Sequence, residues 1–170
     1  MLQVGTILHG TYKIESYLAS GGFGNTYLAK NIEFDETYAI KEFFVKGVCQ
    51  RDGNSTTISV SNAENTNSFE QQREKFKKEA SRLRSLSNPH IVKAYDLFEE
   101  NGTAYYVMDY VNGENLSVRL KRTNAPLAES EVRNYLNQIL DGLEAIHNEG
   151  MFHLDIKPAN IMGIVMMLSS

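Results

Sequence analysis

The hydrophobic pattern changes near residue 111, and this change constrains the fold more than any other feature of the sequence. Before it, alternating runs bounded by turn residues predict β-strands over residues 12–19, 25–31, 36–45, 91–100 and 103–111. After it, residues 114–122 suggest a short helix, and residues 128–149 carry an apolar stripe typical of a long one.

One further helix interrupts the strands. It is predicted to begin at Ser68, a plausible N-cap, and to end before Pro89. The residues ahead of it, 46–67, lose periodicity and are rich in Ser, Thr and Asn, which predicts a polar surface insertion with a short strand at 57–60.

These elements predict an α+β fold of two units. Residues 1–111 would form a five-stranded antiparallel sheet with one helix, carrying the insertion at 46–67. Residues 112–170 would form a helical unit.

Composition excludes several classes of function. The net charge is −4 and no basic block stands out, so we expect no nucleic-acid partner. Cys49 is the only cysteine, which excludes an internal disulfide and fits a reducing compartment, so we expect a cytoplasmic protein. No run approaches the ~20 apolar residues of a membrane helix, and no basic segment leads into an apolar one as in a signal peptide.

A glycine-rich stretch, "LASGGFGNTYLA", lies between the first two predicted strands. Gly21, Gly22 and Gly24 would let the backbone approach a ligand closely and turn its N–H groups toward phosphate oxygens. Taken alone, such a glycine-rich stretch is more often just a flexible hairpin turn. It is not a Walker loop, because Gly24 precedes Asn25 rather than Lys-Ser/Thr, and a strand follows where a dinucleotide fingerprint needs a helix.

Lys41 shares a strand face with Ala39 and Phe43, which are both apolar. A lysine there needs a carboxylate or a phosphate as a partner. Glu79, near the edge of the apolar stripe of its helix, is a candidate. An exposed lysine and a solvated helix glutamate remain the simpler interpretation of each residue alone.

The stretch "HLDIKPANIM" places Asp155, Lys157 and Asn160 in a loop directly after the long helix. Pro158 excludes a continuous helix there. A carboxylate can take the proton of an attacking hydroxyl, a lysine can neutralise a phosphoryl group, and an amide oxygen suits a hard divalent cation. The pattern therefore favours phosphoryl transfer over a plain surface loop.

The order of five segments resembles that of the eukaryotic-like protein kinase family. They are "LASGGFGNTY", "AIK", a helix glutamate followed by "NPHIV", "YYVMDYV" and "HLDIKPANIM". The resemblance runs from about Tyr12 to Met162. "DIKPAN" is similar to the serine/threonine branch, in a bacterial-type form. The fold implied is a kinase N-lobe followed by an incomplete helical C-lobe.

The resemblance implies ATP and Mg²⁺ as cofactors and a protein substrate. Asp155 would be the catalytic base, Lys157 would contact the γ-phosphate, and Asn160 would bind magnesium. The nucleotide would be held by Leu18, Gly21, Gly24, Thr26, Ala39, Lys41, Glu79, Met108, Asp109, Val111 and Asn115. Within this set the glycines would cover the phosphates, Lys41 would pair with Glu79, Met108 would be the gatekeeper, and Asn115 could face the ribose.

Smaller departures from the family pattern accompany the match. The first loop glycine is Ala19, the valine after the loop is Thr26, and the arginine before the catalytic aspartate is Leu154. Leu154 makes the chain resemble members that are not switched by activation-loop phosphorylation.

The largest departure is the absence of an Asp-Phe-Gly sequence, the family's principal magnesium ligand. Only "GIVMMLSS" follows Met162. We expect a kinase sequence truncated after the catalytic loop and inactive as given. The alternative is a noncatalytic, pseudokinase-like module that binds nucleotide or protein. In either case the apolar stripe of the helix at 128–149 would be exposed and could allow self-association.

Overall fold

The computed structural model describes the chain except residues 22–23, 54, 154, 164 and 167–170. The chain divides into two compact units. The first contains residues 1–84 and 94–110, and the second contains residues 85–93 and 111–170. The sequence pattern gave no indication that residues 85–93, between a helix and a strand of the first unit, belong with the second.

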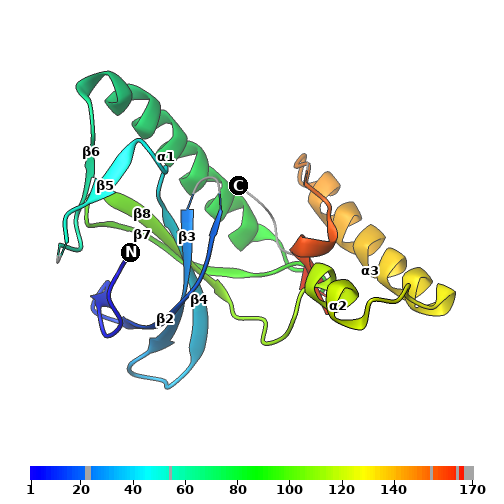
Figure 1. Ribbon diagram of the computed structural model, residues 1–170. Coiled ribbons are helices and arrows are strands. Elements are labelled where there is room, and N and C mark those ends of the chain that lie inside the picture. Colours follow the sequence, from blue (N-terminus) through cyan, green and yellow to red (C-terminus); the bar gives the residue numbers. More distant parts are fainter. Residues whose placement is uncertain (22–23, 54, 154, 164, 167–170) are drawn as a thin grey trace. The chain divides into compact units, whose positions relative to one another are not determined.

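An antiparallel sheet of six strands forms the first unit, in the order β1-β2-β3-β4-β8-β7 (Figure 1). The predicted α+β fold with an antiparallel sheet is confirmed, and the five expected strands are joined by a two-residue edge strand. The strands are β1 (Ile7–Leu8), β2 (Tyr12–Gly21), β3 (Gly24–Asn31), β4 (Thr37–Phe43), β7 (Ala94–Glu100) and β8 (Thr103–Asp109).

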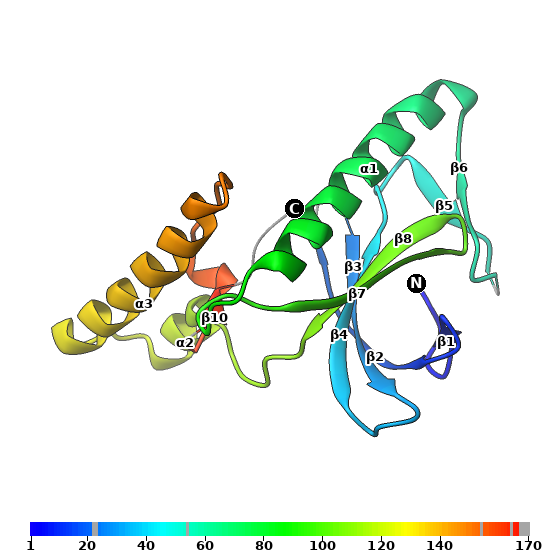
Figure 2. The ribbon, with the colours of Figure 1, turned by 180° about the vertical axis from the view of Figure 1, so that it is seen from behind.

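The helix α1 (Ala63–Ser85) lies across one face of this sheet (Figure 2). Phe76 packs between the Phe43 ring, at 5.5 Å, and the Tyr106 ring, at 5.0 Å. Phe69 lies 5.1 Å from Phe43 on the same side. These aromatic side chains are buried and fasten the helix to β4 and β8.

The opposite face of the sheet carries a second apolar core. It is closed by the N-terminal segment, whose Leu2 and Leu8 are both buried. Both faces of β4 are therefore covered, which explains why its buried residues do not alternate with exposed ones. This core consists of Leu2, Leu8, Tyr12, Ile14, Tyr27, Ala29, Ile40, Phe98, Tyr105 and Val107.

The prediction that α1 begins at Ser68 is wrong. The helix begins at Ala63, five residues earlier, inside the predicted insertion. Ser68 is not its N-cap but a helical residue whose hydroxyl accepts a hydrogen bond from Gln72. The first six residues of α1 are Ala, Glu, Asn, Thr, Asn and Ser, so they show no apolar periodicity that would have revealed the start of the helix.

The remainder of the insertion is a hairpin of β5 (Cys49–Arg51) and β6 (Ile58–Val60). The hairpin was predicted to lie on the surface, but the side chains of Cys49 and Ile58 are buried. The backbone N–H of Ile58 donates to Asn101 O at 2.8 Å, which ties the hairpin to the turn between β7 and β8.

The second unit contains α2 (Leu116–Thr123), α3 (Glu129–Asn148), a 3₁₀ turn (Pro158–Asn160), and the short strands β9 (Ile161–Met162) and β10 (Val165–Met166). Val132, Leu136 and Leu140 of α3 are 46%, 52% and 54% exposed, which confirms the expected exposed stripe over that part of the helix. Ile146, further along, is buried. Over the described residues, we find no helix that combines the length and apolar character needed to span a bilayer.

Candidate active site

The register of the sheet places four of the predicted nucleotide residues on the face that α1 covers. Thr26 on β3 is paired with Lys41 on β4. Ala39 on β4 is paired with Met108 on β8. Because directly paired residues of antiparallel strands point to the same face, these side chains form one surface. Ala39 and Met108 are buried within it.

The two predicted loop glycines have different surroundings. A Cβ atom on Gly24 would lie 2.3 Å from the backbone oxygen of Glu42, so only glycine fits where β3 approaches β4. A Cβ on Gly21 would meet open space. Leu18 lies on β2 at an irregularity of the ladder and is 40% exposed. Gly22, the third glycine of the stretch, lies outside the described residues.

Burial dominates the electrostatics of Lys41 and Glu79. It lowers the pKa of the Lys41 amine, and the neighbouring Glu79 carboxylate opposes that shift. It likewise raises the pKa of Glu79, opposed by Lys41. The Oε1 atom of Glu79 is buried without a hydrogen-bond partner among the described residues. Burial thus disfavours the charged form of each side chain, and each side chain favours the charged form of the other.

The end of β8 holds the predicted gatekeeper, Met108, and a second predicted nucleotide-binding residue, Asp109. Met108 is buried, and Asp109 is the last residue of the strand. The Asp109 carboxylate accepts a hydrogen bond of 2.6 Å from the hydroxyl of Tyr95 on β7. That bond fixes the end of β8, where Asp109, one of the predicted nucleotide-binding residues, lies. Val111 belongs to the second unit.

The catalytic-loop residues come together in the second unit. Lys157 Nζ lies 2.8 Å from Asp155 Oδ2, and Asn160 Nδ2 donates to the same oxygen at 3.0 Å. Asn160 also donates to the Asp155 backbone oxygen at 2.9 Å. His153, 5% exposed, anchors the loop, and its Nδ1 accepts from the Asp155 N–H at 3.3 Å. Leu154 lies outside the described residues.

Asn115 has a structural role in this unit. Its side-chain oxygen accepts a hydrogen bond of 2.9 Å from the Val118 N–H and caps α2. Its backbone bridges to Met162, next to the catalytic loop. The predicted contact with a ribose stays a prediction.

Asn160 is the predicted magnesium ligand. The amide nitrogen of Asn160 is used by Asp155, which leaves its amide oxygen for a hard cation. Within the described ranges, no group of three or more His, Cys, Asp and Glu side chains is arranged to hold a metal ion. Asn160 therefore fits magnesium that is also held by nucleotide phosphates, rather than a cage built from protein alone.

Two polar residues of the first unit escaped the sequence-based prediction. Glu42 is fully buried beside Lys41 in the chain, and the Arg51 guanidinium pairs with it. Alternation along this strand places Glu42 on the same face as Tyr38 and Ile40, opposite Lys41. The argument that Lys41 needs a charged partner applied equally to Glu42.

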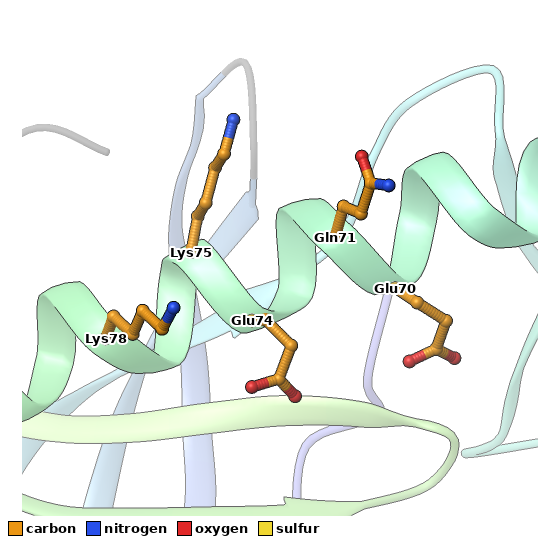
Figure 3. Close-up of a pocket in the computed structure, with 5 residues that line it drawn as sticks. All are labelled: Glu70, Gln71, Glu74, Lys75 and Lys78. Atoms are coloured by element: carbon orange, nitrogen blue, oxygen red, sulfur yellow. The ribbon is translucent and has the colours of Figure 1, made fainter.

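A shallow depression beside α1 is unrelated to this site. Figure 3 shows its side chains projecting from consecutive turns of that one helix. Glu74 pairs there with Lys77, and Glu70 with Arg73, which is typical of a solvated helix face. The depression is lined by Glu70, Gln71, Glu74, Lys75 and Lys78.

Comparison with known proteins confirms the resemblance. The model of the protein kinase domain matches residues 12–165. The chain belongs to the protein kinase family, and its curated relatives include bacterial serine/threonine kinases.

Serine/threonine-protein kinase PrkC of Bacillus subtilis is 34% identical over 159 residues, which cover 94% of this chain and 22% of PrkC. A second relative from Bacillus subtilis, named "Probable serine/threonine-protein kinase YbdM", is 30% identical over 95% of this chain and 56% of its own length. The chain thus spans about a fifth to just over half of these relatives.

Among solved structures, the apo form of PpkA-294 covers the whole chain with a TM-score of 0.90 and 25% identity, and the chain spans 61% of it. The kinase domain of Mycobacterium tuberculosis PknI covers the whole chain with a TM-score of 0.72. At 24% identity, the latter likeness concerns the fold alone.

Proposed function

We propose that this chain carries the ATP-binding and catalytic-loop parts of a serine/threonine protein kinase domain. The reaction is transfer of the γ-phosphoryl group of Mg-ATP to a protein serine or threonine hydroxyl. The observation that carries the proposal is the cluster at the catalytic loop, where Lys157 and Asn160 both contact the Asp155 carboxylate.

Each residue has a defined task. Asp155 accepts the proton of the attacking hydroxyl as its oxygen bonds to the γ-phosphorus, and the bond from that phosphorus to the leaving ADP oxygen breaks. Lys157 neutralises charge on the transferred group. Lys41 holds the α- and β-phosphates and is paired with Glu79, and Asn160 would offer its amide oxygen to the magnesium that accompanies ATP.

We propose further that these 170 residues alone transfer no measurable phosphate. The family's principal magnesium ligand, the aspartate of Asp-Phe-Gly, is absent from the sequence. Neutralising charge on the β- and γ-phosphates is central to the barrier, and one amide oxygen does this poorly. The single, buried Cys49 supports a reducing, cytoplasmic setting for the domain.

The alternative is a noncatalytic module that binds nucleotide or a protein. The exposed stripe of α3 supports it, because an apolar surface of this kind is typical of a docking face.

Incubation with labelled ATP, magnesium and a basic protein separates the two candidates. The 170-residue chain should show no turnover. A chimera that continues after Met162 with the remainder of the PrkC kinase domain should phosphorylate the substrate and lose that activity on Asp155→Asn. A folded chimera that binds ATP without turnover would favour the noncatalytic module, and turnover by the short chain that Asp155→Asn abolishes would refute its proposed inactivity.

A further inference from the structure

Glu42 follows Lys41 on β4, yet its side chain points to the opposite face and is fully buried. We propose that Glu42 and Arg51 are positioning residues for the nucleotide site. Their buried ion pair fastens the β5–β6 hairpin to the strands that carry Lys41 and Gly24. The effect on nucleotide binding rests on the proposed function, but the role of the ion pair in holding the strands can be tested separately.

The Glu42 carboxylate is surrounded by donors. The Asn25 amide and the Tyr27 hydroxyl each donate to Oε2 at 3.0 Å, and the Tyr105 hydroxyl donates to Oε1 at 3.0 Å. The Arg51 guanidinium contacts both carboxylate oxygens. An acceptor-only, ionised carboxylate satisfies all these donors at once. Its negative charge explains why the Arg51 pKa is raised, against the effect of burial.

The network reaches the root of the glycine-rich loop. Asn25 is the cross-strand partner of Glu42 and directly follows Gly24. Gly24 is itself packed so closely against the Glu42 backbone that no Cβ fits. Glu42 therefore holds the start of β3, next to the glycine-rich stretch. It does so with its side chain, through Asn25, and with its backbone, through Gly24.

The network also reaches the hairpin that leads into α1. Arg51 lies on β5 with only 3% of its side chain exposed, and its Nε donates to Thr56 O at 2.9 Å in the hairpin loop. The backbone N–H of Ser61 donates to Val48 O at 2.9 Å and closes the hairpin. Two residues later α1 begins, the helix that carries Glu79.

An apolar side chain could fill the same space without a buried charge. Unlike an apolar side chain, a guanidinium that forms a fork of two contacts with a carboxylate fixes the relative orientation of the two groups, because both groups are planar. The arrangement thus defines how the hairpin and the β3–β4 pair meet. We infer that this geometry keeps Lys41 and Gly24 in place for the phosphates.

Two variants test this role without leaving a buried charge unpaired. Arg51→Lys keeps the positive charge and loses the fork. Arg51→Met with Glu42→Gln removes both charges and keeps the side-chain volumes close. Arg133→Lys, at an exposed Arg133–Glu129 pair of α3, is the matched control. Each variant of the 170-residue chain is examined by thermal melting, amide hydrogen exchange, and binding of a nonhydrolysable ATP analogue with magnesium.

Arg51→Lys should melt near the wild type, and the double variant below it, because one amide oxygen cannot accept from all the donors around the Glu42 carboxylate. Amides of Gly24–Tyr27 and of Lys41 should exchange about tenfold faster, and affinity for the analogue should fall about tenfold, the effect of losing one hydrogen bond to a charged group. Arg133→Lys should change neither measurement.

Unchanged exchange and affinity in a folded Arg51 variant would overturn the positioning role. If only Arg51→Lys folds, it decides the question alone. If the wild-type chain binds no analogue, the proposed function fails, and faster exchange at Gly24–Tyr27 still supports the positioning role while unchanged exchange removes it.

Discussion

Asn160 donates its side-chain N–H to the Asp155 carboxylate at 3.0 Å and to the Asp155 backbone at 2.9 Å. The proposed metal ligand thereby sets the orientation of the proposed base before any cation binds. Lys157, 2.8 Å from the same carboxylate oxygen, completes the cluster. The cluster has one carboxylate, one cation and one free amide oxygen, a donor set that a divalent ion would complete only with outside oxygens.

Asn160→Asp should convert this loop into a magnesium-responsive one. The substitution replaces the amide donor of Asn160 with a second carboxylate, and the two carboxylates repel each other. Because the Asp155 side chain is 40% exposed, we expect a loss of only about 1 kcal/mol in unfolding free energy. Millimolar magnesium should restore the melting temperature of Asn160→Asp but not that of the control Asn160→Ala. Equal responses of the two variants would contradict this role for the amide oxygen.

Glu79→Gln should stabilise the chain and weaken its binding of ATP. Burial raises the Glu79 pKa, so this carboxyl binds a proton more readily in the folded than in the unfolded state. A folded pKa above the unfolded value gives stability that is present at low pH and is lost as the pH rises through the folded pKa. The melting temperature of Glu79→Gln relative to wild type should therefore rise from pH ~4 toward neutrality.

Glu64→Gln, at an exposed position of the first turn of α1, is the control for that series and should show no growing advantage. A Glu79→Gln variant that melts below wild type at neutral pH would mean that attraction to Lys41 outweighs burial.

The tyrosines provide a test at alkaline pH. The pKa values of Tyr12 and Tyr27 are raised to about 12, mainly by burial, and that of Tyr95 is raised to about 12, mainly by its hydrogen bond to Asp109. Each favours the folded state below pH ~10, and this stability is lost as the pH rises toward 12. Phenolate absorbance should show fewer than the nine tyrosines ionising near pH 10 in the native chain, and all nine in denaturant.

Asp109→Asn isolates one of these phenols. It should lower the pKa of Tyr95 toward the ordinary value near 10, with a smaller lowering at Tyr38, whose pKa the Asp109 charge also raises. If the number of tyrosines that titrate near pH 10 stays the same, the 2.6 Å bond does not control the Tyr95 phenol.

Local chemistry explains what could be predicted from the sequence. The strands around Lys41 and the α3 stripe follow from periodicity, and Asp155, Lys157 and Asn160 are close because they lie within six residues of one another. Gly150, with a φ of +67°, ends the predicted long helix as a glycine in that conformation should.

Polar contacts between residues far apart in the sequence could not be predicted in this way. Arg51 lies nine residues from Glu42, in a segment whose composition indicates a surface loop, and nothing in its spacing shows that it turns inward. Residues 85–93 similarly join the second unit through contacts such as Asn88 with Asp141, 53 positions apart. Such contacts depend on the completed fold, so a linear pattern does not reveal them.

The exposed stripe of α3 should govern the solution behaviour of the chain. Leu136 and Leu140 lie one turn apart and are each more than half exposed, so copies of the chain can bury them against one another. Leu136→Glu with Leu140→Lys places an attractive pair at helical spacing and removes the apolar surface. Sedimentation velocity should show concentration-dependent association of the wild type and a monomer for this double variant, with no loss of melting temperature.

Ile146→Ala is the matched control on the same helix. Ile146 is fully buried, so its truncation should cost about 2–4 kcal/mol of unfolding free energy and leave the association surface in place. A wild type that stays monomeric at high concentration would contradict the role of the stripe. A double variant that still associates would place the self-association surface elsewhere on the chain.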